Sequence, residues 1–246
     1  MKKTISVFMA IALAFTTSIL AFATDYDYSI LSSENVLQST GMPQSKIRQL
    51  DENVIDFIAN DLKKSGKVEE FRYFSTEELS MPITRVNQVL EGISFTVTAF
   101  KSNSEVYVYP TYEFTTDKKP VGHDSFSFQF GDALRPYEYG GQAWYKDYTM
   151  TSWEKGGSLT ANVQSLNGAE YSGAQLGTPD YSMKIRGCAY AHCQIGSGTD
   201  KRIVMMYMYN PNRDNYSISF SYSGVGISYS SNGSIYTASK TEILNY

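Results

Sequence analysis

The residues best suited to recognising a ligand lie in one segment, from residue 137 to residue 153. It contains both tryptophans of the chain, four tyrosines, an amide and several charged groups. Flat aromatic rings stack on the C–H face of a sugar, while amides and carboxylates bind its hydroxyls. The predicted binding residues are Tyr139, Trp144, Tyr145 and Trp153 for stacking, and Gln142 and Asp147 for hydroxyls. In the alternative interpretation, the two tryptophans fill the core between sheets.

The two cysteines, Cys188 and Cys193, are separated by four residues. Outside the cytoplasm such a pair is typically oxidised, and a turn can bring the Cα atoms within the ~4.4–6.8 Å of a disulfide. We therefore predict a disulfide that fixes one hairpin. His192 beside Cys193 offers two alternatives, a metal site or a Cys–His nucleophile. A zinc site needs further ligands, and His123 is the only other histidine of the chain.

Two hydrolytic arrangements can be examined in the sequence. His123-Asp124-Ser125 has the residue types of a catalytic triad, but neighbours on a strand point to opposite faces and cannot form one. A glycoside hydrolase needs two carboxylates about 5–9.5 Å apart. The acidic candidates are Glu113, Asp117, Asp124, Asp132, Glu138, Asp147 and Glu154. Their spacing selects no pair, so no catalytic residue is predicted, and a non-catalytic protein is favoured.

Cofactor signals are weak in this chain. Gly224-Val225-Gly226 lacks the third glycine of a dinucleotide motif, and no Gly-Lys-Ser/Thr sequence occurs. The sequence therefore implies no cofactor and no metal. Calcium bound by loop aspartates such as Asp117 or Asp180 remains an open alternative.

The first residues have the features of an export signal. Lys2 and Lys3 precede an apolar run from Ile5 to Leu20, and Ala21-Phe22-Ala23 provides small residues at a cleavage site. We predict a signal peptide over residues 1–23, with an uncleaved membrane anchor as the alternative. The chain of 246 residues has a net charge of −4, which argues against nucleic acid as a partner.

Residues 29–66 have a helical pattern. Ser32 and Ser33 can cap a helix that ends at Gly41, and Pro43 opens a second helix. A third helix is predicted from Asp51 to Gly66. Its apolar stripe, which we expect to pack on the rest of the protein, consists of Val54, Ile55, Phe57, Ile58 and Leu62.

The start of this helical region is similar to the N-terminal part of secreted proteins of Gram-positive bacteria that have no known activity. The similarity rests on Leu31-Ser32-Ser33-Glu34 and Thr40-Gly41-Met42-Pro43 and covers about a fifth of the chain. It implies export and assigns no activity.

From residue 68 the hydrophobic period changes to two, which is typical of strands. Alternating segments are expected at residues 93–99, 106–114, 126–130, 159–163, 183–185, 216–222 and 225–229, and a fully buried strand at 203–209. The predicted turns are 117–120, Gly140-Gly141, Gly156-Gly157, 210–212 and Asn232-Gly233. Strands without intervening helices predict an antiparallel β-sandwich, jelly-roll-like or similar.

The segments 216–222 and 225–230 alternate apolar residues with serines and carry no charge. This amphipathic character also occurs in membrane-inserting hairpins, but each segment is shorter than the ~9–11 residues of a spanning strand. We expect an ordinary edge sheet here.

The sequence therefore predicts a signal peptide (1–23), a helical N-terminal extension (24–66) and a β-sandwich domain (67–246). The expected function is extracellular, non-catalytic binding of a glycan or a cell-envelope component. A membrane-damaging or pore-forming β protein and an extracellular hydrolase remain as alternatives.

Overall fold

The computed structural model describes residues 28–79, 88–115, 122–147, 149–165, 167–174, 184–212, 215–221 and 224–246. The predicted signal peptide lies outside these residues, as do the predicted turn 117–120, Met183 and the two loop aspartates considered for calcium. The chain divides into two units. The first ends at Ser32 and contains the short helix η1 (Tyr28–Ile30). The second extends from Ser33 to Tyr246 and contains the other helices and all the strands that the structure describes.

Three α-helices open this second unit, as the capping signals predicted. They are α2 (Ser33–Ser39), α3 (Gln44–Ile47) and α4 (Glu52–Lys64), followed by the short helix η2 (Val68–Glu70). Gly41 and Gly66, just beyond α2 and α4, have φ angles of 84° and 69°. A residue with a Cβ is strained at such angles, which explains why glycine ends both helices. The helices and the sheets belong to one unit, so residue 66 does not separate two units.

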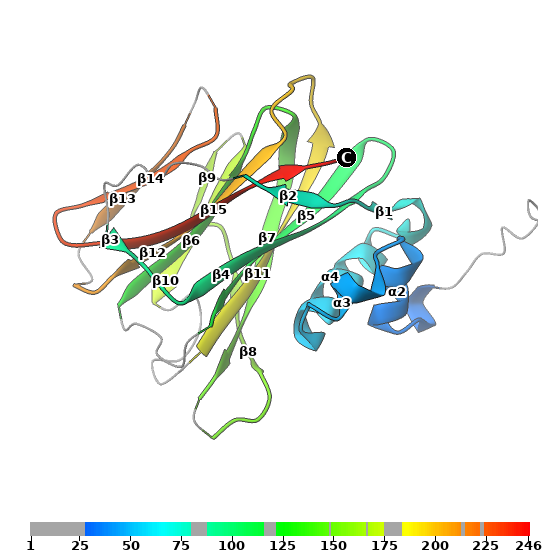
Figure 1. Cartoon of the computed structure of the whole chain (residues 1–246), viewed down its shortest axis with the longest axis horizontal. Coiled ribbons are helices and arrows are strands. Elements are labelled where there is room, and N and C mark those ends of the chain that lie inside the picture. Colours follow the sequence, from blue (N-terminus) through cyan, green and yellow to red (C-terminus); the bar gives the residue numbers. More distant parts are fainter. Residues whose placement is uncertain are drawn as a thin grey trace, which may run out of the picture. The chain divides into compact units, whose positions relative to one another are not determined.

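The remainder of the unit is mainly β, as predicted, and two sheets face each other (Figure 1). Sheet A has the order β1 (Arg72–Tyr73), β4 (Ile93–Lys101), β5 (Glu105–Phe114), β11 (Lys184–Ile195), β7 (Leu134–Lys146) and β8 (Glu154–Leu159). All neighbouring strands of this sheet are antiparallel. Helices α2–α4 lie beside its outer face (Figure 1).

Sheet B has the order β2 (Thr76–Glu78), β15 (Tyr236–Leu244), β12 (Arg202–Asn210), β6 (His123–Phe130), β10 (Gly168–Ala174) and β9 (Val163–Ser165). The short strand β3 (Gln88–Val89) pairs with β15 in parallel, whereas the other pairs are antiparallel. The segment 159–163, predicted as one strand, instead joins β8 to β9. Residues 160–162 are not in a strand, so this prediction was wrong.

Aromatic side chains fill the space between the sheets. Phe126, Phe128 and Phe130 of β6 are fully buried there, together with Tyr112 of β5 and Tyr207 of β12. The Phe126 ring lies 4.8 Å from the Tyr112 ring, measured between centroids. Alternation along β6 places Ser125 and Ser127 on the opposite face, which confirms that His123-Asp124-Ser125 cannot form a triad.

The hairpin of β13 (Tyr216–Phe220) and β14 (Ile227–Ser231) forms a separate two-stranded sheet. It is therefore not an edge of sheet B. Its apolar residues pack against Val204 and Met208 of β12, so that β12 is covered on both faces. Tyr229 of the hairpin bonds Ser125, which also donates to the buried carboxylate of Glu170. This second cover explains why residues 203–209 form an unbroken apolar run.

Two predicted glycine turns are wrong. Gly140-Gly141 lies inside β7 and Gly156-Gly157 lies inside β8. A Cβ atom at position 140 would be 2.6 Å from the Tyr190 ring, a contact that real side chains do not make. Glycine is therefore required because a neighbouring side chain approaches the strand closely, and not because the chain turns.

The predicted disulfide is also wrong. Cys188 and Cys193 are free and buried, and both lie on the continuous strand β11. A strand rises about 3.3 Å per residue, so five steps hold their Cα atoms far beyond disulfide range. Cys193 belongs to the core between the sheets, while Cys188 pairs with Gln142 of β7. The residues between the cysteines form no turn that could bring them together.

Because neither thiol is oxidised, adding a reductant is expected to leave the thermal unfolding midpoint unchanged. A thiol titration of the denatured, unreduced protein is expected to find two free thiols for each chain. A titre near zero, with a midpoint that falls in reductant, would contradict this arrangement.

Candidate functional site

A groove with a volume of about 650 Å³ lies between helix α4 and strands β7 and β8. We call it the α4 groove. Its volume is within the range of about 300–1,000 Å³ that is typical of ligand sites. The wall formed by α4 consists of Asn53, Asp56, Phe57, Asn60, Asp61 and Lys64. The opposite wall includes Tyr139, Gln142, Trp144, Lys155, Ser158, Thr160, Gln164 and Tyr190.

The amphipathic pattern of α4 produces its wall. Residues 53, 56, 60 and 64 recur at intervals of three and four, so they form one polar stripe along the helix. The buried stripe of α4 consists of Val54, Ile55, Ile58 and Leu62, as predicted. Phe57 lies between the two stripes. Its ring contacts the Trp144 ring edge to face, with 5.9 Å between centroids, and lies 6.2 Å from the Tyr190 ring.

The alternation of β7 separates the predicted binding residues. Gln142 and Trp144 line the α4 groove on the outer face of sheet A. Tyr145, at an odd position, packs against the core between the sheets. Tyr139 also packs against that core, although it contributes to the groove lining. The four aromatic residues therefore do not form one stacking platform, and that part of the prediction was wrong.

Trp144 is 5% exposed and lies beneath α4. The alternative interpretation, in which Trp144 is a buried core residue, is therefore correct about the burial of the ring. It is wrong about the location, because the ring is covered by a helix and does not lie between the sheets. Gln142 is held by hydrogen bonds from Nε2 to the carbonyl oxygens of Ala143, Gly156 and Gly157. These bonds occupy the amide nitrogen, so Gln142 can offer a ligand its oxygen as an acceptor.

Asp147 and Trp153 have other roles and do not line the groove. The carboxylate of Asp147 accepts hydrogen bonds from the backbone and hydroxyl of Thr149 and from the backbone of Met150. The bonds from Thr149 lower the pKa of Asp147. The Trp153 ring stacks on the guanidinium of Arg186, 3.9 Å from its centroid. Arg186 is buried and forms ion pairs with Asp51 and Glu113 at 2.5 and 2.9 Å.

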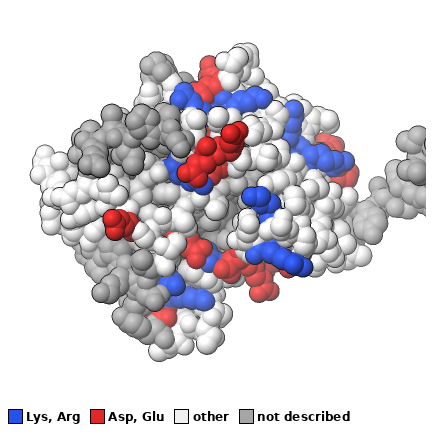
Figure 2. All heavy atoms as spheres, in the orientation of Figure 1, with Lys and Arg blue, Asp and Glu red and all other residues white. Residues whose placement is uncertain are grey.

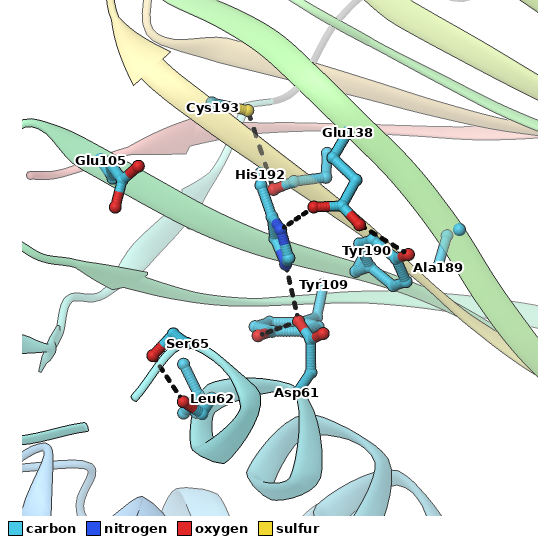
Figure 3. A network of polar contacts seen from close by, with 12 residues as sticks. Asp61, Leu62, Ser65, Glu105, Tyr109, Glu138, Ala189, Tyr190, His192 and Cys193 are labelled. Carbon is cyan, nitrogen blue, oxygen red and sulfur yellow. Dashed lines mark hydrogen bonds and ion pairs between the residues drawn. The ribbon is translucent and has the colours of Figure 1, made fainter. Parts of the chain in front are cut away.

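A polar network adjoins the groove (Figure 3). The imidazole of His192 lies between two carboxylates, with Nε2 2.7 Å from Asp61 Oδ2 and Nδ1 2.9 Å from Glu138 Oε2. The Tyr109 hydroxyl donates to the same Asp61 oxygen at 2.8 Å. Asp61 comes from α4, Glu138 from β7 and His192 from β11, so the network joins the helix to sheet A.

The charge of His192 follows from these contacts. A carboxylate only accepts, so this geometry favours the imidazolium form, in which both ring nitrogens donate. Burial lowers the pKa of His192, but the hydrogen bonds and charges of Asp61 and Glu138 outweigh burial and raise its pKa above the ordinary 6.5. With both nitrogens engaged, His192 is not poised to take a proton from a nucleophile.

The structure does not favour the two alternatives to a disulfide, a Cys–His nucleophile and a metal site. Burial raises the pKa of Cys188 to about 12, and burial also raises the pKa of Cys193. Neither thiol is therefore a ready nucleophile at neutral pH. Among the described residues, no group of three or more histidine, cysteine or acidic side chains is arranged to hold a metal ion.

Sequence analysis missed Asp61 and did not connect His192 with Glu138. One signal was present, because Asp61 follows Val54 by seven positions and so falls on the buried side of α4. A charged residue on a buried face needs a partner. The identity of that partner, on a strand 131 positions later, could not be obtained from spacing.

On the face shown in Figure 2, the acidic and basic side chains of the described residues are interspersed, without a large area of one sign. None of the helices in the described ranges is long and apolar enough to cross a membrane.

No protein-family model and no curated protein matches the chain. Solved structures with similar folds include one described as a pore forming protein, with a TM-score of 0.38, 7% identity, and coverage of 70% of this chain and 90% of that one. Another is the collagen-binding subdomain of the Enterococcus faecalis surface protein ACE, with a TM-score of 0.34, 10% identity, and coverage of 59% and 90%.

A third is a carbohydrate-binding module specific for non-crystalline cellulose, with a TM-score of 0.25, 10% identity, and coverage of 49% and 91%. These three structures are described by different ligands and activities. At identities and TM-scores as low as these, the similarities assign neither a family nor a ligand to this chain.

Proposed function

We propose that this protein is an extracellular, non-catalytic binding module whose α4 groove holds a neutral oligosaccharide. The observation that carries the proposal is the composition of the groove, which places aromatic rings beside side-chain amides and hydroxyls. Sugars present C–H faces and hydroxyl groups together, and this combination of side chains is complementary to both.

The aromatic part of the groove includes Phe57, whose ring contacts both Trp144 and Tyr190. Trp144 is too deeply buried to stack fully on a ligand, so we expect it to position Phe57 and to close the floor. The groups available to sugar hydroxyls are Asn53, Asn60, Gln142, Ser158, Thr160 and Gln164. Gln142 can accept a hydrogen bond through its oxygen, and the others can donate or accept one.

A neutral ligand fits the charges of the groove. Lys64 and Lys155 are accompanied by Asp56 and Asp61, and Asp61 is already paired with His192. Such a balance gives no preference for an acidic or a basic polymer. Export, predicted from residues 1–23 and from the similarity to secreted proteins of Gram-positive bacteria, would bring the groove to glycans outside the cell.

The alternatives have less support. A membrane-damaging role would require the β13–β14 hairpin to detach from β12, on which it packs, and to insert into the membrane. Its strands have five residues each, against the ~9–11 of a spanning strand. A hydrolase would need a free general base or nucleophile, and the histidine beside the groove has both nitrogens occupied.

Binding can be tested with a glycan array, followed by calorimetry on the oligosaccharides that bind. Asn60→Ala and Gln164→Ala each remove an exposed amide from the groove. Each is expected to weaken binding about fivefold to tenfold, the effect of one lost hydrogen bond. The unfolding midpoint should remain unchanged because neither side chain is buried.

The matched control is Asn103→Ala, which removes an exposed amide in the turn between β4 and β5, outside the groove lining. It is expected to bind like the wild type. The proposal fails if the wild type binds no neutral oligosaccharide, or if the groove variants bind as tightly as the Asn103 variant.

A further inference from the structure

Besides burying an apolar stripe, helix α4 is joined to sheet A by several side-chain contacts. One is the aromatic contact of Phe57 with Trp144. A second is the ion pair between Arg186 and Asp51, the residue that precedes α4. The third is the pairing of Asp61 with His192 and Tyr109, which lies toward the end of the helix (Figure 3). One of the contacts that set the position of α4, and with it one wall of the groove, therefore involves a group that can gain or lose a proton.

Several other groups face His192 or its partners. They are Asp61 of α4, Glu105, Tyr107 and Tyr109 of β5, Tyr137 and Glu138 of β7, and Tyr190 of β11. The Tyr107 ring stacks on the imidazole with 3.8 Å between centroids. These groups enclose the ring on both faces and at both nitrogens.

The phenols among these groups stay neutral at moderate pH. Burial raises the pKa of Tyr107 and of Tyr190, and for Tyr190 the charge of Glu138 adds to this effect. Burial, and then the charge of Asp61, raises the pKa of Tyr109 well above 10.0. Between about pH 6 and pH 9, His192 is therefore the member of the network expected to change charge.

Loss of the proton changes the network in a definite direction. A neutral imidazole has one N–H, so it can donate to Asp61 or to Glu138 but not to both. The side chain of Glu138 is 52% exposed and can turn to water, whereas that of Asp61 is 10% exposed. Asp61 then remains near the sheet without a positive partner, which favours states in which α4 moves away and water reaches the carboxylate.

We propose that the proton on His192 fixes α4 against sheet A and thereby keeps the α4 groove in its binding conformation, so that ligand binding is stronger in mildly acidic than in alkaline solution. This regulation rests on the proposed function of the groove. A histidine whose pKa is raised by folding stabilises the fold fully below its unfolded pKa. This contribution is lost as the pH rises through the raised value, so alkaline pH releases the helix.

The release of α4 can be measured without a ligand by hydrogen–deuterium exchange. The protection of the peptide covering residues 52–64 is measured at about pH 6 and at about pH 9. At each pH it is expressed relative to the protection of residues 202–210 in the covered strand β12. This ratio corrects for the intrinsic pH dependence of exchange. In the wild type, relative protection of α4 is expected to fall at least about fivefold, the order expected for a hydrogen bond to a charged group.

Variants separate the role of the proton from other effects. His192→Gln is expected to abolish the pH dependence, and Glu138→Gln, at a half-exposed position, to reduce it. Tyr109→Phe, which removes the other bond to Asp61, should lower protection at both pH values but keep the difference. His123→Gln replaces the other histidine of the chain and should behave like the wild type.

Calorimetry with an oligosaccharide that binds at about pH 6 completes the test. Affinity is expected to fall at about pH 9 in the wild type and in the His123 variant, but not in the His192 variant. Equal protection of α4 at both pH values overturns this inference, even if the groove binds its ligand. A pH-dependent helix together with no binding to any neutral oligosaccharide overturns the proposed function instead, and with it the regulation of binding.

Discussion

Trp144→Ala is expected to lower the free energy of unfolding by about 3–5 kcal/mol, the range measured for removal of a buried large aromatic ring. The ring is 5% exposed and fills the space between β7 and Phe57 of α4. Removal of the indole ring leaves a cavity between α4 and sheet A, and the helix and the sheet cannot move together enough to fill it. Because Phe57 loses its support, glycan binding should be lost in the same variant. Chemical denaturation and calorimetry measure the two effects.

Trp153→Ala provides the matched control, since it removes the other tryptophan of the chain. Trp153 is half-buried and covers the guanidinium of Arg186, so we expect a loss of about 1 kcal/mol. Fluorescence can check the burial directly. In Trp153→Phe the remaining emission comes from Trp144, which should be blue-shifted and poorly quenched by acrylamide. Ready quenching of Trp144, or equal losses of stability in the two alanine variants, would contradict the placement of Trp144 beneath α4.

Phe126→Ala is also expected to cost about 3–5 kcal/mol. Phe126 is fully buried between the sheets, and its ring lies 4.8 Å from the Tyr112 ring and 6.1 Å from the Phe128 ring. It pairs with Tyr171 of β10 and with Tyr207 of β12, so both neighbouring strands pack around the cavity that its removal leaves. Urea denaturation should show a lower midpoint with an unchanged slope.

Phe220→Ala makes the same substitution in the β13–β14 hairpin, where the ring is half-buried. We expect a smaller loss of unfolding free energy, because the half-buried Phe220 ring buries less apolar surface than Phe126 does. The hairpin can also adjust to fill the space that the ring leaves. Phe126→Leu, which retains most of the side-chain volume, should be intermediate. If Phe220→Ala is as damaging as Phe126→Ala, the hairpin contributes to stability as much as the core between the sheets does.

The local hydrophobic pattern of the sequence was sufficient to identify several elements. Alternation identified β4, β5 and β6, a continuous apolar run identified β12, and the period of α4 identified its buried stripe. The local pattern did not predict the role of the glycines. Gly140, for example, lies in a strand where the Tyr190 side chain approaches the backbone closely. The same residue type serves turns elsewhere, and only the position of a neighbouring strand distinguishes the two uses.

For the candidate site, the sequence identified Gln142 and Trp144, which do line the groove, because aromatic and amide residues are concentrated in one segment. It also grouped with them Tyr145, Asp147 and Trp153, which the structure places elsewhere. Neighbours in sequence were treated as neighbours in space, and a strand sends adjacent side chains to opposite faces.

By itself, the sequence determined a mainly β chain with an amphipathic helical start, since hydrophobic periodicity is a local property that each segment carries alone. The tertiary structure decided which segments meet. It separated Cys188 from Cys193 along one strand, and it brought Asp61 and His192 together across 131 positions. Pairing of this kind depends on strand register and on the packing of α4 over sheet A, and these arise only when the whole chain buries its apolar faces together.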